Sequence, residues 1–147
     1  KSVSQTSDER EKNIISGITE KYEDLFMQLR PVLFSWKSGA DGIHMGFGAQ
    51  TTLEMAEQCG ISADELAAVH RSETEEPWSM SYTEIVPLTV QMTQKALLTL
   101  DSTRKEVSAL GQNMTARMES LQYQLAQAFD RIAVLEKENK SLRQALS

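Results

Sequence analysis

The sequence predicts an α+β protein, in which a small domain of helices and a β-hairpin is followed by a long C-terminal helix that forms a coiled coil. Three observations support this prediction. An amphipathic segment is followed by a turn-rich, β-branched segment, short capping motifs follow these, and the last third repeats apolar residues every seven positions. The length of 147 residues and the apolar content of 40% fit one modest domain with an appended helix.

The first predicted helix ends at a proline. Pro31 disfavours helical geometry in the residue before it, so the helix should stop at Arg30. Its apolar side chains fall at helical spacing, and they are Ile14, Ile18, Tyr22, Leu25, Phe26 and Leu29.

A β-hairpin is expected next. Residues 32–36 are β-branched and aromatic, residues 37–42 have the Gly, Ser and Asp content of a turn, and residues 43–49 supply the second strand. We expect four aromatic residues near these segments to belong to the core, namely Phe34, Trp36, Phe47 and Tyr82.

Short helices and caps connect the hairpin to the C-terminal helix. Residues 50–58 should be helical, with Gly60 as the stop signal, and the Ser62–Glu65 spacing of a capping box predicts a second short helix. After a Glu-rich loop at residues 73–76, a second capping-box spacing at Ser81 places the start of the long helix near that residue. Pro87 then falls in an irregular early turn.

The C-terminal third carries a heptad repeat. One series is Leu100, Val107, Met114, Leu121, Ala128, Leu135 and Leu142, and the residues four positions later are Arg104, Gly111, Met118, Leu125, Ile132, Asn139 and Leu146. The first series therefore occupies d positions and the second a positions. The strongest part of this seam consists of Leu121, Leu125, Ile132, Leu135, Asn139 and Leu142, in which the asparagine fixes the register.

Such a helix should associate with another copy of itself. From Pro87 to Leu146 it would be roughly 90 Å long at 1.5 Å per residue, which exceeds what a compact domain of this size can cover. The alternative is an antiparallel hairpin within one chain, but no Gly or Pro follows Gly111 to provide a turn. An asparagine at an a position is best attested in parallel dimers, and the mixed Met, Leu, Ile and Ala core is also compatible with three strands.

The charge distribution argues against nucleic-acid binding. The chain carries 15 Lys plus Arg and 21 Asp plus Glu, for a net charge of −6. Residues 54–84 hold eight acids and one base, and residues 97–147 hold six acids and seven bases. No segment concentrates the basic residues that phosphate binding needs, and no run of 18 apolar residues predicts a membrane span or a leader.

Metal and cofactor binding are not expected either. The chain has one cysteine, Cys59, and two histidines, His44 and His70, which excludes an internal disulfide and argues against a structural zinc site. Gly46 and Gly48 lack the further residues of a phosphate-binding loop.

Ser7 and Lys12 are the closest pair that could supply a nucleophile and a base without a histidine. A Ser-Lys dyad needs a neutral lysine beside the hydroxyl, whereas this segment is dense in charge and would ordinarily be a solvated helix start. In an α-helix, five residues turn through roughly 500°, so the two side chains would not share a face. Either the segment is not α-helical or Lys12 comes from another protomer.

Four stretches occur in a recognisable order: residues 7–12 (SDEREK), 29–37 (LRPVLFSWK), 44–50 (HMGFGAQ) and 82–88 (YTEIVPL). Together they resemble the intramolecular chaperone auto-processing domain that closes phage tail fibres, tailspikes, endosialidases and neck appendages, and that also occurs in myelin regulatory factor. The resemblance covers about residues 7–90 and is followed by the helical tail usual in this family.

The resemblance implies an assembly device. Domains of this family form homotrimers with a parallel coiled coil, help a long fibre to fold, and then release themselves by a serine-lysine reaction. Carried over, Ser7 is the nucleophile, Lys12 is the general base, and the scissile bond joins Thr6 to Ser7. Asp8 and Arg10 match the family pattern and would orient the cleavage segment, and His44 would hold a carbonyl group or the serine.

The expected organisation has three parts: residues 1–6 end the preceding fibre, residues 7–90 form the chaperone domain, and residues 91–147 form the coiled-coil helix. The expected partners are further copies of the chain and its own preceding region, in the host cytoplasm during virion assembly, with release from the mature fibre after cleavage. The first alternative is a non-cleaving module that stays attached to its fibre, which Glu11 favours because the family commonly has an apolar residue there. Further alternatives are an unrelated coiled-coil adaptor and a fragment of a membrane-associated transcription factor.

Overall fold

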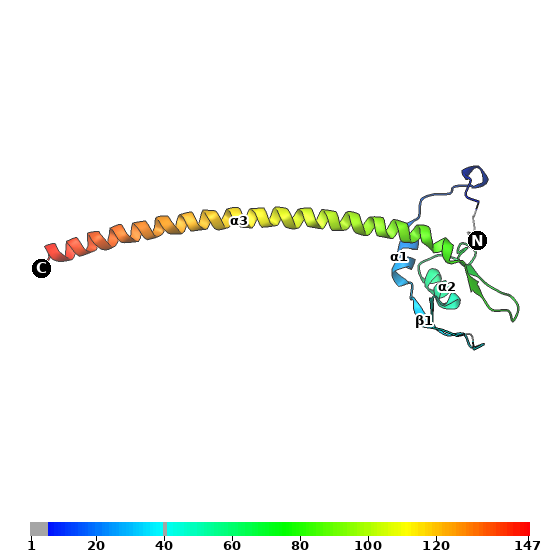
Figure 1. Cartoon of the computed structure of the whole chain (residues 1–147). Coiled ribbons are helices and arrows are strands. Elements are labelled where there is room, and N and C mark those ends of the chain that lie inside the picture. Colours follow the sequence, from blue (N-terminus) through cyan, green and yellow to red (C-terminus); the bar gives the residue numbers. More distant parts are fainter. Residues whose placement is uncertain (1–5, 40) are drawn as a thin grey trace. The chain divides into compact units, whose positions relative to one another are not determined.

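The structure is a computed structural model that describes residues 6–39 and 41–147. The chain divides into two compact units, residues 1–96 and residues 97–147. Helices and two small antiparallel hairpins precede a long C-terminal helix, which confirms the predicted α+β class (Figure 1). Of the predicted first part, residues 1–5 lie outside the described residues, and the predicted boundary between residues 90 and 91 stays a prediction.

The elements follow one another in a simple order. They are η1 (Glu9–Glu11), α1 (Glu20–Gln28), β1 (Val32–Phe34), β2 (His44–Gly46), α2 (Ala49–Gln58), β3 (Val69–His70), β4 (Ser79–Met80), η2 (Tyr82–Ile85) and α3 (Val86–Ala145). Here η denotes a 3₁₀ helix.

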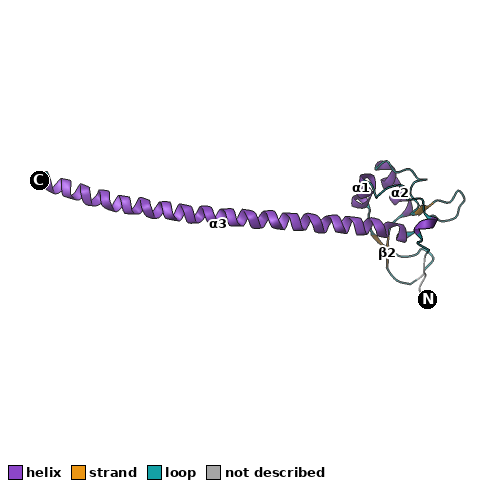
Figure 2. Ribbon diagram, turned by 90° about the horizontal axis from the view of Figure 1, so that it is seen from above, coloured by secondary structure: helices purple, strands orange, loops and turns teal. Residues whose placement is uncertain are grey.

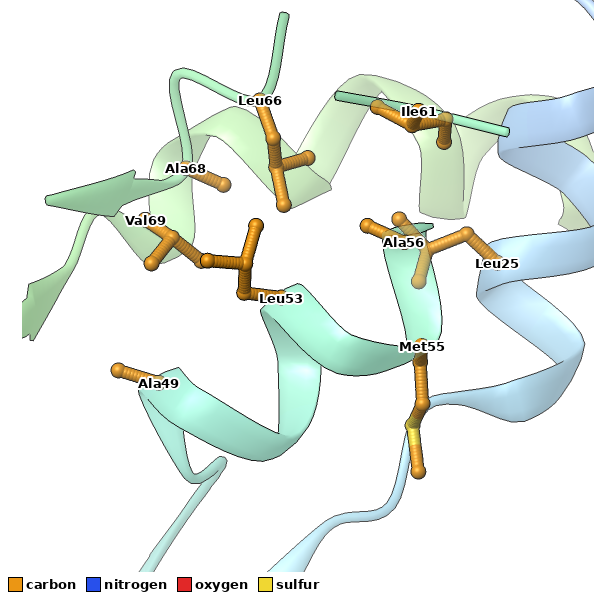
Figure 3. Close-up of a cluster of buried hydrophobic side chains, with 9 residues drawn as sticks. All are labelled: Leu25, Ala49, Leu53, Met55, Ala56, Ile61, Leu66, Ala68 and Val69. Carbon is orange, nitrogen blue, oxygen red and sulfur yellow. The ribbon is translucent and has the colours of Figure 1, made fainter. Parts of the chain in front are cut away.

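The core of the first unit forms around α2. Buried side chains of α2 meet Leu25 from α1 and the segment that follows α2 (Figure 3). The cluster consists of Leu25, Ala49, Leu53, Met55, Ala56, Ile61, Leu66, Ala68 and Val69. Ala49, Leu53 and Ala56 are spaced by four and three residues, so they share one face of α2, and this face is the one that packs.

A glycine ends α2 and returns the chain to the core. Gly60 has a φ of +76°, which a glycine adopts without steric cost. Its N–H donates to the Glu57 carbonyl at 3.0 Å, and the Ile61 N–H donates to the Ala56 carbonyl at 2.9 Å. This is a Schellman motif, and it brings the fully buried Ile61 against the end of the helix, as the predicted stop at Gly60 requires.

The predicted hairpin is present and short. β1 and β2 are antiparallel, with the pairs Val32↔Gly46, Leu33↔Met45 and Phe34↔His44. A second hairpin, β3–β4, was not predicted, because each strand has two residues and the Glu-rich loop separates them. Ser81 N–H donates to the Ala68 carbonyl at 2.8 Å and extends this second pairing toward η2.

Several local predictions were wrong. α1 begins at Glu20, and Ile14 and Ile15 lie outside it with 72% and 96% exposure. The Glu65 carboxylate accepts hydrogen bonds from the Ser62 N–H at 2.9 Å and the Ser62 hydroxyl at 3.3 Å, but these contacts close a turn and start no helix. Trp36 is 55% exposed rather than buried, because the two-stranded hairpin has no second layer over it within the described residues.

Tyr82 also differs from the core prediction. It is 45% exposed, although its hydroxyl contacts β2. The long helix was expected to begin near Ser81, but α3 begins at Val86 and is preceded by the 3₁₀ turn η2. Pro87 is the second residue of α3, where a helix needs no N–H from it.

The second unit consists of the α3 residues from Leu97 onward and the two residues after α3. Residues 97–145 extend over about 74 Å at 1.5 Å per residue, as one uninterrupted helix (Figure 2). All side chains of this unit are exposed in the single chain, including Leu125 at 56% and Leu135 at 46%. Among the described residues, no helix combines the length and apolarity needed to cross a bilayer.

Candidate active site

The candidate dyad lies on a 3₁₀ turn near the N-terminus. Asp8 caps this turn, since its Oδ1 accepts from the Arg10 N–H at 3.0 Å. Glu11 N–H donates to the Asp8 carbonyl and Lys12 N–H to the Glu9 carbonyl, both at 3.1 Å. The turn ends at once, because Lys12 has extended backbone angles of φ −120° and ψ 136°.

The turn brings Ser7 and Lys12 together within one chain. Lys12 Nζ donates to Ser7 Oγ at 2.8 Å. The segment that carries the two residues is therefore not α-helical, and the contact between Ser7 and Lys12 needs no second protomer. Both residues are exposed, so in the single chain the pair is solvated.

Asp8 and Arg10 form a clamp across the same turn. Arg10 Nε lies 3.0 Å from Asp8 Oδ1 and 3.1 Å from Oδ2, and Arg10 Nη2 also bonds to Oδ2. The side-chain hydrogen bonds from Arg10, and then its backbone N–H, hold the pKa of Asp8 below its usual value. These two predicted supporting residues thus contact each other, and Asp8 also fixes the backbone between Ser7 and Lys12.

His44 lies on β2 beside aromatic rings. Its ring is 5.4 Å from that of Phe34 and 6.3 Å from that of Trp36, measured between centroids. Its Nε2 is buried and has no hydrogen-bond partner among the described residues. Within that same part of the chain it makes no hydrogen bond to Ser7 or Lys12, so its predicted contact with a carbonyl group or the serine stays a prediction.

The segment that carries the dyad is loosely attached. Except for half-buried Asp8, residues 6–17 are exposed, including Thr6 on the acyl side of the predicted scissile bond. The hydrogen bonds of this segment run between its own described residues, as in the Ser16 hydroxyl donating to the Gly17 carbonyl at 2.8 Å. The first link to the rest of the unit is Gln91 Nε2, which donates to the Ile18 carbonyl at 3.2 Å.

Three polar contacts that hold the unit together were not predicted. Gln91 Nε2 donates to Glu23 Oε1 at 2.6 Å, and Lys95 pairs with the other oxygen, so Glu23 joins α1 to α3. The Phe47 N–H donates to the Tyr82 hydroxyl at 3.0 Å and joins the residue after β2 to η2. None of these pairs has a sequence signal, since the partners are 35 to 72 residues apart.

No group of three or more His, Cys, Asp or Glu side chains is arranged for a metal ion in the part of the chain that the structure describes.

Comparisons with known proteins show what this chain is similar to. Residues 7–61 match the family peptidase S74, chaperone of endosialidase, and the match begins at Ser7. A crystal structure described as that of a novel intramolecular chaperon has the same fold, with 22% sequence identity and a TM-score of 0.51. The matched region covers 62% of this chain and 98% of the chain in that crystal structure. No curated protein matches the chain.

Proposed function

We propose that this chain carries an intramolecular chaperone domain like those of the chaperone of endosialidase family, and that it releases itself after use by cutting its backbone between Thr6 and Ser7. In this proposal the domain assists the folding of its own polypeptide. In the proposal, the assisted region precedes Ser7 and belongs to a trimeric phage tail fibre or tailspike, which assembles in the host cytoplasm.

One observation carries the proposal, the 2.8 Å contact between Lys12 Nζ and Ser7 Oγ. In the ammonium form the lysine donates to the hydroxyl. In the neutral amine form the same contact reverses, and the lysine accepts the hydroxyl proton, as a general base for a serine nucleophile does.

The proposed reaction consists of acyl transfer followed by hydrolysis. Ser7 Oγ attacks the Thr6 carbonyl carbon while Lys12 takes the hydroxyl proton. The Thr6–Ser7 C–N bond breaks, the Ser7 nitrogen receives that proton from Lys12, and an ester joins Thr6 to Ser7 Oγ. Water then attacks the ester, which leaves a carboxylate on Thr6 and restores the Ser7 hydroxyl. A single turnover on the same chain requires no separate substrate pocket.

The exposure of the dyad supports coupling between cleavage and assembly. A lysine acts as a base in its neutral form, and removal of water disfavours the charged form. In the single chain Lys12 is exposed to water. In the proposal, neighbouring protomers cover the N-terminal segment, desolvate the pair and thereby start the reaction.

The heptad seam supports parallel self-association. With the a and d residues facing inward, each g position meets the e position five residues later on the neighbouring helix. Arg131 then meets Glu136 of a second copy, and Glu138 meets Arg143 of that copy. In this register the charged g–e pairs are attractive and none brings like charges together. The homotrimer is proposed because the family forms trimers.

A mass measurement tests the dyad. After self-association, we expect the wild-type chain to lose residues 1–6 and to start at Ser7, whereas Ser7→Ala and Lys12→Ala remain whole. Ser16→Ala and Lys37→Ala are matched controls, since they remove the same groups from exposed positions away from the dyad. A carrier protein fused ahead of Lys1 makes the cut visible on a gel. Cleavage of either dyad variant at the wild-type rate would remove the catalytic assignment.

The second candidate function is a retained folding and trimerisation module. The solvated state of Ser7 and Lys12 in the single chain favours this reading, as does the charged Glu11 between them. It predicts that the wild type and both dyad variants form the same assembly and stay whole. The mass measurement therefore separates the two candidates.

A further inference from the structure

We propose that Arg104 forms an oxyanion-binding site between copies of the chain, at which inorganic phosphate binds and strengthens their association. Each copy contributes one arginine, so the site is incomplete in the single chain. The inference rests on the parallel self-association in the proposed function, and it adds to that association a ligand and a means of regulation.

Arg104 occupies a position that is ordinarily apolar. In the heptad repeat it is the a residue between Leu100 and Val107, which are d residues, and Leu97 is the a residue one heptad earlier. These three apolar neighbours are 60% to 64% exposed in the single chain. In a parallel assembly equal residue numbers share a layer, so the Arg104 side chains of all copies meet between apolar layers.

The charge of Arg104 is uncompensated in the single chain. The ion pairs between the described residues leave Arg104 without a carboxylate partner, and Asp101, the acid one turn earlier, pairs with Lys105 at 2.7 Å. Glu106 accepts a hydrogen bond from the Ser102 hydroxyl at 3.4 Å. This glutamate lies about 200° from Arg104 around the helix, on the side away from the seam.

The facing helix offers Arg104 no acid in its own layer. An a side chain of a parallel coiled coil inserts between four residues of the neighbouring helix, which for Arg104 are Leu100, Thr103, Arg104 and Val107. These four residues and Asp101 help to line a groove of about 410 Å³ on the single helix. Asp101 is an e residue, so it flanks the Leu100 layer, whereas the Thr103 hydroxyl flanks the Arg104 layer and can donate to a bound anion.

The chemistry of this layer selects an oxyanion. Guanidinium groups that share a layer repel one another unless an anion lies between them. Each guanidinium presents a planar fork of N–H donors that matches the oxygens of phosphate, and such charge-assisted hydrogen bonds strengthen where apolar layers exclude water. A tetrahedral oxyanion has acceptors for an arginine from every copy, whereas chloride offers only a point charge.

The position of the layer in the repeat makes it suited to regulation. Gly111, the next a residue, has no side chain to pack, and a Cβ there would meet nothing within 4 Å in the single chain. Two consecutive a layers therefore add little apolar packing to the part of the seam that follows the first unit in the sequence. Phosphate bound at Arg104 would strengthen association in this part of the helix.

Sedimentation of the full chain at rising concentrations of inorganic phosphate tests the inference. We expect the association constant to rise at least about fivefold, because a ligand that binds only the assembled form stabilises it by mass action. Sodium chloride at equal ionic strength is the control for charge screening and should have a smaller effect.

Three variants locate the effect. Arg104→Leu should associate more tightly than the wild type without phosphate and lose the phosphate response, since the like charges and the anion ligands are removed together. Arg117→Leu is the matched control, because it removes the same charge from a g position, and it should keep the response. Asp101→Asn should keep the response as well. The far-ultraviolet circular dichroism of each variant verifies its helix content.

The outcomes separate the inference from the proposed function. Equal responses to phosphate and chloride overturn the inference, since screening then explains both. A phosphate response that persists in Arg104→Leu also overturns it, because the anion then binds elsewhere. Weaker association and a lost response in Asp101→Asn would show that Arg104 pairs with Asp101 of a neighbouring copy instead. Failure of the wild type to associate under any of these conditions contradicts self-association itself.

Discussion

At the residue scale, the candidate dyad depends on a side chain that takes no part in the proposed reaction. Asp8 accepts the Arg10 N–H and clamps the Arg10 side chain, and this capped 3₁₀ turn sets where Lys12 leaves the turn. A serine and a lysine five positions apart in an α-helix point in different directions. The 2.8 Å contact between Ser7 Oγ and Lys12 Nζ is therefore possible because the 3₁₀ turn ends at Lys12.

The pH dependence of stability tests another single residue, Glu23. The hydrogen bond from Lys95, followed by that from Gln91, lowers the pKa of Glu23 below 4.5. A lowered pKa in the folded state means that this carboxylate stabilises the fold above about pH 4.5, and that the contribution is lost as the pH falls through the folded-state value. We expect Glu23→Gln to unfold more readily than the wild type near pH 7.

The difference between Glu23→Gln and the wild type should shrink as the pH falls through the folded-state pKa, below which the carboxyl group is protonated in both states. Thermal unfolding of both proteins from pH 7 downward measures it. Glu119→Gln is the control, because that carboxylate is exposed on the second unit. A constant difference across the pH range would mean that shape rather than charge at Glu23 matters.

At the element scale, the join between β2 and η2 depends on the absence of a side chain at Gly46. A Cβ at this buried position would collide with the Tyr82 hydroxyl and would also lie 3.1 Å from Phe34. We expect Gly46→Ala to destabilise the first unit by about 1–3 kcal/mol, the usual cost of overpacking. Urea unfolding measures the change, and Gly17→Ala, with nothing within 4 Å, is the control.

A second variant separates the collision from a general effect on the strand. Tyr82→Phe removes the colliding oxygen together with its hydrogen bond to the Phe47 N–H. Gly46→Ala combined with Tyr82→Phe should therefore cost less than the sum of the two single changes. Strict additivity would show that the tyrosine hydroxyl is not what Gly46 accommodates.

Local signals predicted the elements whose ends are fixed by backbone chemistry. Gly60 ended α2 where expected, Pro31 kept α1 from passing Arg30, and the turn residues after Trp36 placed the hairpin. The start of α1 was missed because Ile14 has helical spacing but is 72% exposed, with no side chain of the described residues burying it. The spacing of apolar residues predicts the apolar face of a helix, but the helix forms only where other parts of the fold pack against that face.

The candidate site was predictable in its residues and not in its geometry. The residues of SDEREK indicated which side chains to consider, whereas the distance from Lys12 to Ser7 depends on turn angles that no periodicity gives. The Glu23 and Tyr82 contacts were missed for a related reason. Single polar pairs between distant segments leave no repeat in the sequence.

At the scale of the whole molecule, the first unit leaves several surfaces exposed in the single chain. Its N-terminal segment is exposed, its first hairpin has two strands with an exposed Leu33–Met45 pair, and Val86 and Val90 at the start of α3 are exposed. A two-stranded hairpin is marginal without a further layer. If the proposed self-association occurs, we expect neighbouring copies of the chain to cover these surfaces, and folding of the domain would then be linked to assembly.

If assembly starts cleavage, changes in the heptad seam should slow a reaction that occurs 118 residues earlier in the chain, since Leu125 and Ser7 differ by that number. Leu125→Asp and Ile132→Asp put charge into the seam, and we expect each to lower both the assembled fraction and the cleavage rate by about tenfold or more. Ser120→Asp adds the same charge at an outward c position and should change neither.

Protein concentration provides the decisive readout for this coupling. For a seam variant, the cleavage rate should rise with concentration and follow the assembled fraction measured by analytical ultracentrifugation, because mass action restores association. The chemistry at Ser7 and Lys12 is unchanged in these variants, so a chain that assembles should cleave at the wild-type rate. A variant that stays monomeric and cleaves normally would show that the 2.8 Å contact within one chain is sufficient, and assembly would then serve folding alone.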